Sequence, residues 1–156
     1  MNYQAKTLNY DHYENTNKNN LIIIHGLLGC KDNWRSIAKQ LENFNIYCLD
    51  CRNHGDSFHD NDMRYETMAN DIINFINKFN ITNPYIIGHS MGGKIAMKCL
   101  QDHPNKFNKA IIIDIAPKLY ENHHENILTV LQSANLFNYN NRSSIDSYFS
   151  AFIDNP

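Results

Sequence analysis

Long apolar runs are missing from this 156-residue chain, and so is an excess of either charge. The longest apolar runs, such as Leu21 to Ile24, are far too short to cross a bilayer. Residues Met1 to Tyr13 contain no apolar segment of the kind that a secretory signal requires. The formal net charge is −2 and no basic stripe is present, which argues against nucleic acid or an acidic membrane surface as partners. We therefore expect a cytoplasmic protein that acts neither in membranes nor on nucleic acid.

Cysteine is sparse, and the four residues at positions 30, 48, 51 and 99 are scattered. Without a secretory signal they are expected to be reduced thiols. Cys48 and Cys51 have the C-x-x-C spacing of redox motifs, but they follow a predicted strand instead of opening a helix. No second pair completes a zinc site. We therefore interpret the spacing as coincidental.

The chain does contain short apolar strands that alternate with amphipathic helices. Strands are predicted at 21–24, 46–49, 85–87 and 110–113. Apolar residues at helical spacing predict helices from Trp34 to Leu41, from about 66 to 80 and from Ser90 to about 101. Near-continuous apolar strands that alternate with helices are typical of a mostly parallel sheet with helices on both faces, which is the α/β class.

Polar residues follow the predicted strands, namely His25, Asp50, His89 with Ser90, and Asp114. In parallel sheets of this kind, ligands collect at the carboxyl ends of the strands. These residues are therefore expected to gather at one edge of the sheet, where an active site would lie.

The run Gly88 to Gly92 (Gly-His-Ser-Met-Gly) matches the nucleophile elbow G-x-S-x-G of α/β-hydrolases. In such an elbow the serine occupies a strained strand-to-helix turn, and the flanking glycines avoid clashes where strand and helix approach each other. The hydroxyl then lies at a helix N-terminus, where free N–H groups favour developing negative charge. The run lies between a predicted strand and a predicted helix, so Ser90 is the candidate nucleophile. A glycine-rich turn that merely packs is the alternative.

The run His25 to Gly29 (His-Gly-Leu-Leu-Gly) follows the first apolar strand, where this fold places a donor of the oxyanion hole. We assign the backbone N–H groups of Leu27 and Met91 to the oxyanion hole. His25 itself is interpreted as a residue that organises the loop by hydrogen bonding, in preference to a direct catalytic role.

Asp114 is the candidate triad acid, because a carboxylate after the strand that follows the elbow can reach a histidine and hold its tautomer. Spacing alone leaves two alternatives open. Asp114 could cap a turn, since the chain turns away at Ile115 to Pro117. Asp50, which ends an earlier strand, could serve as the acid instead.

Four blocks of the sequence resemble the YbfF-type esterases, a branch of the α/β-hydrolases. The blocks are His25–Gly29 with Asp32–Trp34, Asp50–Ser57 (Asp-Cys-Arg-Asn-His-Gly-Asp-Ser), Ile87–Lys94 and Ile113–Pro117 (Ile-Asp-Ile-Ala-Pro). The resemblance implies hydrolysis of carboxylesters or acyl thioesters, such as acyl-CoA, without metal or cofactor. It also implies that Asp114 is the acid, in preference to Asp50. A helical cap is expected after the last block, so residues 1–118 are interpreted as the amino-terminal part of the core and 119–156 as cap.

The expected catalytic histidine is absent. In α/β-hydrolases it follows the last core strand, whereas this chain ends 66 residues after Ser90, before any further strand. His103 closes a helix, and His123 and His124 lie in the presumed cap, so none matches that position. We therefore expect a fold truncated before its last strands, as a shortened product, as one piece of a split protein or as part of a longer protein. A second chain or a missing carboxyl-terminal segment would complete it, and strand 110–113 would otherwise present an open apolar edge.

The sequence thus predicts a serine hydrolase that cleaves small acyl esters or thioesters by a Ser-Asp-His mechanism. Because the histidine is missing, the chain alone is expected to show little or no turnover. The rival hypothesis is a catalytically inactive hydrolase remnant or binding module.

Overall fold

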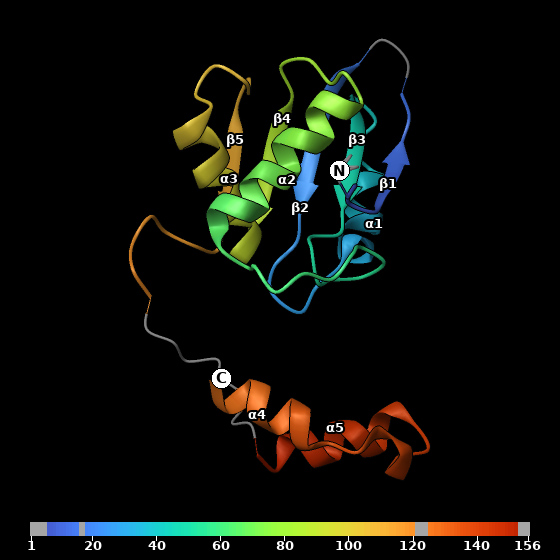
Figure 1. The fold of residues 1–156 in the computed structure, drawn as a ribbon. Helices are drawn as coiled ribbons and strands as arrows, with labels where there is room; N and C mark the ends of the chain where they lie inside the picture. The colour runs from blue at the N-terminus through green and yellow to red at the C-terminus, as the bar shows by residue number, and fades with distance from the viewer. Residues whose placement is uncertain (1–5, 16–17, 121–124, 153–156) are drawn as a thin grey trace. The chain divides into compact units, whose positions relative to one another are not determined.

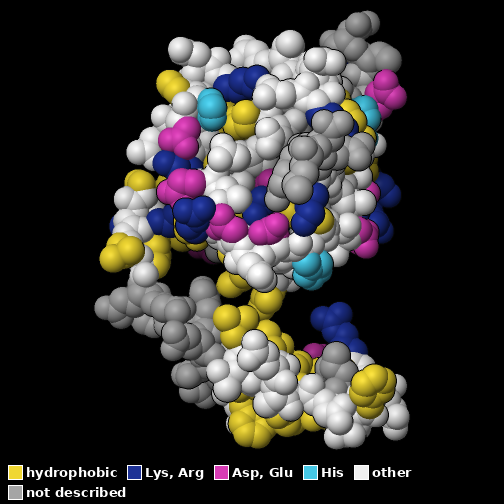
Figure 2. All heavy atoms as spheres, in the orientation of Figure 1, with side chains coloured by type: hydrophobic (Ala, Val, Ile, Leu, Met, Phe, Trp, Pro, Cys, Tyr) yellow, Lys and Arg dark blue, Asp and Glu magenta, His cyan; other side chains and the backbone are white. Residues whose placement is uncertain are grey.

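The structure is a computed structural model that describes residues 6–15, 18–120 and 125–152. The chain divides into two compact units, Met1–Pro117 and Lys118–Pro156. The first unit holds a five-stranded sheet (Figure 1). Acidic and basic side chains are interspersed on its face in Figure 2, as the near-zero net charge suggests.

The sheet has the strand order β1-β3-β2-β4-β5. All neighbouring strands are parallel except β1, which pairs antiparallel with β3. The bounds are β1 Tyr10–Tyr13, β2 Asn19–Ile24, β3 Phe44–Leu49, β4 Tyr85–His89 and β5 Ala110–Ile113. The four predicted strands and the mostly parallel sheet are confirmed. β1 was not predicted, because its residues Tyr-Asp-His-Tyr form a short and partly polar edge strand without an apolar run.

Alternate residues of the central strands pack on opposite faces of the sheet, as the two-residue period of a strand requires. Ile22 and Ile24 of β2 belong to a core shared with α2 (Tyr65–Lys78) and α3 (Met91–Asp102). Leu21 and Ile23 belong to a second core with Trp34 and Ala38. Both faces are therefore covered, and α2 and α3 lie side by side on one of them (Figure 1).

The predicted helix from Trp34 to Leu41 is wrong in its extent. The structure has a 3-10 turn, η1 (Lys31–Trp34), followed by a four-residue helix, α1 (Arg35–Ala38). After Lys39 the backbone bonds reach only three residues back, since the Leu41 N–H donates to the Ala38 carbonyl at 3.2 Å. The apolar spacing was real, with Trp34 and Ala38 buried, but Ile37 is 44% exposed and the helical turns do not continue.

The second unit contains α4 (Glu125–Ser133), η2 (Leu136–Asn138) and α5 (Arg142–Ser150). Both α4 and α5 lie in the region where the family resemblance predicts helices. Large apolar side chains are exposed on it, among them Phe137 at 98% and Phe152 at 61%. Its role as a cap stays a prediction. None of the helices in the described part of the chain has the length and apolar character of a membrane-spanning segment.

The strand β5 ends the sheet on the side away from β1. Its Ile111 side chain is 57% exposed. Ile111 is thus an apolar side chain at the edge strand, where the sequence predicted an open apolar edge.

Candidate functional site

Ser90 occupies the turn between β4 and α3 with φ 49° and ψ −113°, a conformation that non-glycine residues rarely adopt. Its backbone N–H donates to the Ile113 carbonyl at 3.0 Å, which ties the turn to β5. A Cβ on Gly88 would collide with the Gly92 carbonyl, and a Cβ on Gly92 would lie 2.5 Å from the Ile24 carbonyl oxygen. The strained turn and both close approaches match the geometry expected of a nucleophile elbow.

The loop after β2 lies against Ser90. A Cβ on Gly26 would lie 3.3 Å from the Cβ of Ser90, so the two backbones meet at this point. The loop is closed by the Gly29 N–H, which donates to the Gly26 carbonyl at 3.0 Å. Met91 is the first residue of α3, so its N–H has no acceptor within the helix. The assignment of the oxyanion donors to the N–H groups of Leu27 and Met91 stays a prediction.

His25 is almost completely buried, and both of its ring nitrogens are engaged. Nδ1 lies 2.7 Å from the Gly26 carbonyl oxygen and must therefore carry the proton, while Nε2 accepts from the Cys51 N–H at 3.0 Å. Burial lowers the pKa of His25, an effect that the Gly26 carbonyl partly opposes and the nearby His54 ring reinforces. A neutral ring with no free nitrogen suits the interpretation that His25 organises the loop.

This arrangement predicts a pH-dependent contribution to stability. The unfolded chain takes up a proton on His25 near pH 6.5, whereas the folded protein resists it, so this contribution is complete above about pH 6.5 and is lost as the pH falls. We expect His25→Gln to lower the free energy of unfolding by about 1–3 kcal/mol near neutral pH. We also expect a shallower loss of stability between about pH 7.5 and 5 than in the wild type. Urea unfolding at a series of pH values measures both; parallel pH profiles would contradict the neutral, buried ring.

The two candidate acids differ in their surroundings. The Asp114 side chain is 83% exposed and follows β5 at φ 55°, with its Oδ2 3.7 Å from His89 Nε2. Asp50 is fully buried, and its carboxylate accepts three hydrogen bonds from Lys31 and Asp56. Asp114 therefore has a carboxylate open to a further partner, whereas that of Asp50 is enclosed. His89 was expected at this edge of the sheet, but no role was predicted for it.

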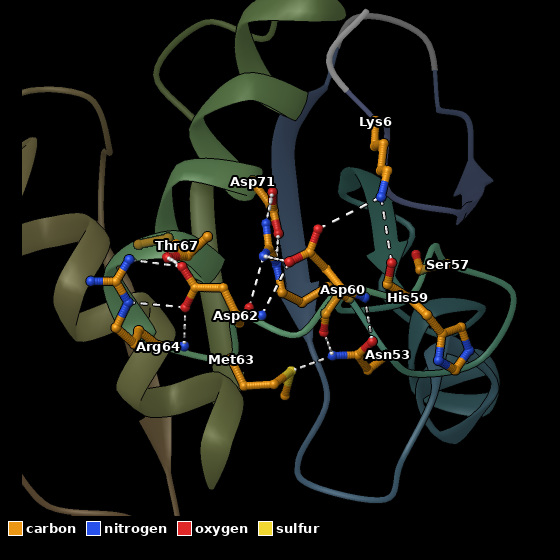
Figure 3. Close-up of polar contacts among 12 residues, drawn as sticks. Lys6, Asn53, Ser57, His59, Asp60, Asp62, Met63, Arg64, Thr67 and Asp71 are labelled. Carbon is orange, nitrogen blue, oxygen red and sulfur yellow. Dashed lines mark hydrogen bonds and ion pairs between the residues drawn. The ribbon is translucent and has the colours of Figure 1, made fainter. Parts of the chain in front are cut away.

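The loop that follows β3 is tied to α2 by a buried ion pair. Arg52 Nε and Nη2 donate to the two carboxylate oxygens of Asp71 at 2.6 and 2.7 Å. Arg52 Nη1 also donates to the Asp62 carbonyl at 2.8 Å. Figure 3 shows Asp71 of α2 together with Asp60 and Asp62 of the loop that precedes it. The ion pair fixes the segment that carries Asp50 and Cys51.

A pocket of about 480 Å³ opens beside the loop after β2, within the size range of small-molecule sites. Its wall includes the apolar side chains of Leu27, Leu28, Trp34 and Ile37, together with the His89 ring. Leu28 is 61% exposed. Such a wall suits the apolar part of a small ligand.

Neither His103 nor the C-x-x-C pair offers an alternative chemistry at this site. His103 caps the far end of α3, about 20 Å along the helix axis from Ser90. His123 and His124 lie outside the described residues. Burial raises the pKa of the Cys48 thiol to about 12 and that of Cys51 further, so neither thiol of the C-x-x-C pair is poised for redox chemistry.

Known proteins resemble this chain in sequence and structure. Residues 19–145 match the family model described as alpha/beta hydrolase fold. A Haemophilus influenzae protein described as an esterase/lipase is 47% identical over 102 residues, which cover 65% of this chain and 36% of that protein. Ethanol acetyltransferase 1 of Hanseniaspora uvarum is 41% identical over 100 residues, which cover 62% of this chain and 30% of that protein.

The solved structure of a marine microorganism esterase is similar to this one, with a TM-score of 0.89 and 41% sequence identity. The match covers 97% of this chain and 60% of that chain. The present chain thus spans about a third of the length of the curated relatives named above.

Proposed function

Because the chain belongs to the alpha/beta hydrolase family, whose similar members include esterases, we propose that Ser90 is the nucleophile of an ester-cleaving hydrolase. The observation that carries the proposal is the strained Ser90 turn between β4 and α3, with the loop after β2 packed against it. A strained residue at the carboxyl end of a parallel strand is a common feature of active sites. The narrower resemblance to YbfF-type esterases stays a prediction.

The proposed reaction is acyl transfer to water. The Ser90 hydroxyl attacks the ester or thioester carbonyl, and its proton passes to a histidine that Asp114 orients. The N–H groups of Leu27 and Met91 donate to the oxyanion, and the alcohol or thiol leaves with the proton from the histidine. Water then attacks the acyl-serine by the same proton route and regenerates Ser90.

The histidine base is proposed to come from outside these 156 residues, in a further segment or a second chain, since the relatives are much longer. The helical unit 118–156 is proposed to be part of the cap. Small acyl esters are the proposed substrates, since the pocket of about 480 Å³ beside the site is small and largely apolar. Acyl thioesters are a narrower proposal within the same chemistry, because they present the same carbonyl.

Fluorophosphonate labelling tests the proposal. The Ser90 oxygen would displace fluoride from phosphorus, and the resulting adduct is located by mass spectrometry of peptides. We expect slow but selective labelling of Ser90, because the oxyanion donors retain part of the rate enhancement when the base is missing. Ser90→Ala should abolish this adduct. Labelling that is absent, or that is spread equally over other serines such as Ser36 and Ser133, would count against Ser90 as nucleophile.

A second candidate function is acyl transfer to an alcohol, which the ethanol acetyltransferase relative favours. It uses the same acyl-serine but resolves it with an alcohol in place of water. Assays with an activated acetyl ester, with and without added ethanol, separate the two functions. Ethyl acetate formed in preference to acetate would indicate transfer, and acetate alone would indicate hydrolysis.

A further inference from the structure

The oxyanion loop, defined here as residues His25–Cys30, is held at both ends by two consecutive residues of the segment after β3. These are Asp50 and Cys51. At its first end, the Cys51 N–H donates to His25 Nε2 at 3.0 Å, and His25 Nδ1–H in turn donates to the Gly26 carbonyl. The ring thus links Cys51 to the backbone of Gly26. The anchoring point is therefore one residue away from Leu27, the proposed oxyanion donor.

At its second end, the oxyanion loop is held by the Asp50 carboxylate. The Lys31 N–H donates to Oδ1 at 2.7 Å, and the Lys31 ammonium donates to Oδ2 at 3.0 Å. The Asp56 N–H also donates to Oδ2, at 3.0 Å. Lys31 directly follows the loop, so its backbone bond fixes where the loop ends.

The Asp50 carboxylate is enclosed by the described residues around it. Asp50 has no exposed surface, and a Cβ on Gly55 would collide with the carboxyl group. Gly55 has φ 51°, so glycine here permits both the turn and the close approach. Burial alone would raise the pKa of Asp50, but the hydrogen bonds from Lys31 and Asp56 and the Lys31 charge together lower it. A buried carboxylate with this many donors stays ionised and holds its partners firmly.

We propose that Asp50 is a positioning residue for the oxyanion hole, which acts through Lys31 to set the position of the Leu27 N–H. The proposal rests on the proposed function, because it assigns Asp50 a role in the same site. It gives Asp50 a function other than triad acid. It also explains why a charged group lies buried next to this loop, where burying an apolar side chain would cost less desolvation free energy.

The test compares two variants that make the same change from acid to amide. Asp50→Asn keeps the shape but places an amide where three donors now meet. Asp56→Asn is the matched control, since the Asp56 side chain is 75% exposed and contacts the same Lys31 ammonium, while its backbone N–H is retained. Lys31→Met is the second test variant in case Asp50→Asn does not fold. It removes the ammonium but keeps the backbone bond to Asp50.

Two readouts are measured on the whole chain. Hydrogen exchange of the Gly29 amide, which bonds to Gly26, reports on the oxyanion loop, and the Ile23 amide in β2 reports on global unfolding. The rate of fluorophosphonate labelling of Ser90, per folded molecule, reports on the oxyanion hole. We expect Asp50→Asn to speed Gly29 exchange, relative to Ile23, by roughly tenfold and to slow labelling by roughly tenfold. Asp56→Asn should change neither, and Lys31→Met should act in the same direction more weakly.

Equal acceleration of Gly29 and Ile23 would show a purely structural role and overturn the proposal, as would unchanged exchange in Asp50→Asn. Unchanged Gly29 exchange in Lys31→Met would overturn it if Asp50→Asn does not fold. A wild-type chain that is not labelled at Ser90 would count against the proposed function. In that case the exchange of Gly29 alone decides whether Asp50 holds the loop.

Discussion

Replacing Gly92 with alanine should destabilise the fold by about 3 kcal/mol, the upper part of the range for overpacking. A Cβ at this position would lie 2.5 Å from the Ile24 carbonyl oxygen and 2.6 Å from the His25 carbonyl oxygen. Both are backbone atoms at the end of β2, in the centre of the sheet, so neither can move aside without shifting the strand. Alanine would therefore push α3 away from the sheet and distort the turn that holds Ser90.

The neighbouring Gly93 is the matched control, because it lies in the same helical turn. A Cβ there would lie 2.5 Å from the Ile115 Cγ2, a side-chain methyl group, and its nearest backbone atom would be the Gly88 carbonyl oxygen at 3.1 Å. Alanine also gains about 1 kcal/mol of helix propensity over glycine at either position. We thus expect Gly93→Ala to lower the free energy of unfolding by about 1 kcal/mol, clearly less than Gly92→Ala. Urea unfolding followed by the fluorescence of Trp34, the single tryptophan, measures both variants.

The same Gly92→Ala variant should also lose Ser90 labelling in whatever fraction stays folded. The reason is geometric: the Cβ would press on the strand end that leads into the oxyanion loop at His25. If Gly92→Ala proved as stable as Gly93→Ala and as reactive as the wild type, the close approach of α3 to β2 would not require glycine at this position.

Local signals account for the parts of the fold that were predicted correctly. The strand β5 is apolar throughout and β2 ends in four apolar residues, while α2 and α3 carry apolar residues at helical spacing. The elbow at Ser90 was also readable, because its glycines and its place between strand and helix lie within a few residues. By contrast, β1 has no apolar run of its own and forms only because it pairs with β3.

The contacts that support the site could not be predicted from local sequence patterns. Lys31 meets Asp50, and Arg52 meets Asp71, each across 19 positions of sequence. The approach of His89 to Asp114 depends on the pairing of β4 with β5. Each of these contacts exists only after the strand order is set. The sequence could therefore place Asp50 at the correct edge of the sheet without showing that its carboxylate is enclosed.

The second large effect is expected at the buried pair of Arg52 and Asp71. Arg52→Met should lower the free energy of unfolding by about 3–5 kcal/mol, because it leaves the Asp71 carboxylate buried without its partner. The Arg52 guanidinium is bidentate on that carboxylate, and the two side chains are only 7% and 9% exposed. Asp71→Leu alone should also be destabilising, since it leaves the buried guanidinium without its bidentate partner and with only the Asp62 carbonyl and, at 3.7 Å, Asp60.

The double variant, which combines Arg52→Met with Asp71→Leu, separates the charge from the packing. It removes both charges together, so we expect much of the lost stability to return. Arg64→Met is the control, because Arg64 forms an ion pair with Asp62 in the same region (Figure 3) but is 75% exposed. Exposed pairs contribute little, and its loss should be hard to resolve by urea unfolding. An Arg52→Met variant no less stable than Arg64→Met would show that the buried pair does not hold the segment after β3 against α2. The anchoring of Asp50 and Cys51 would then have to depend on the hydrogen bonds of that segment alone.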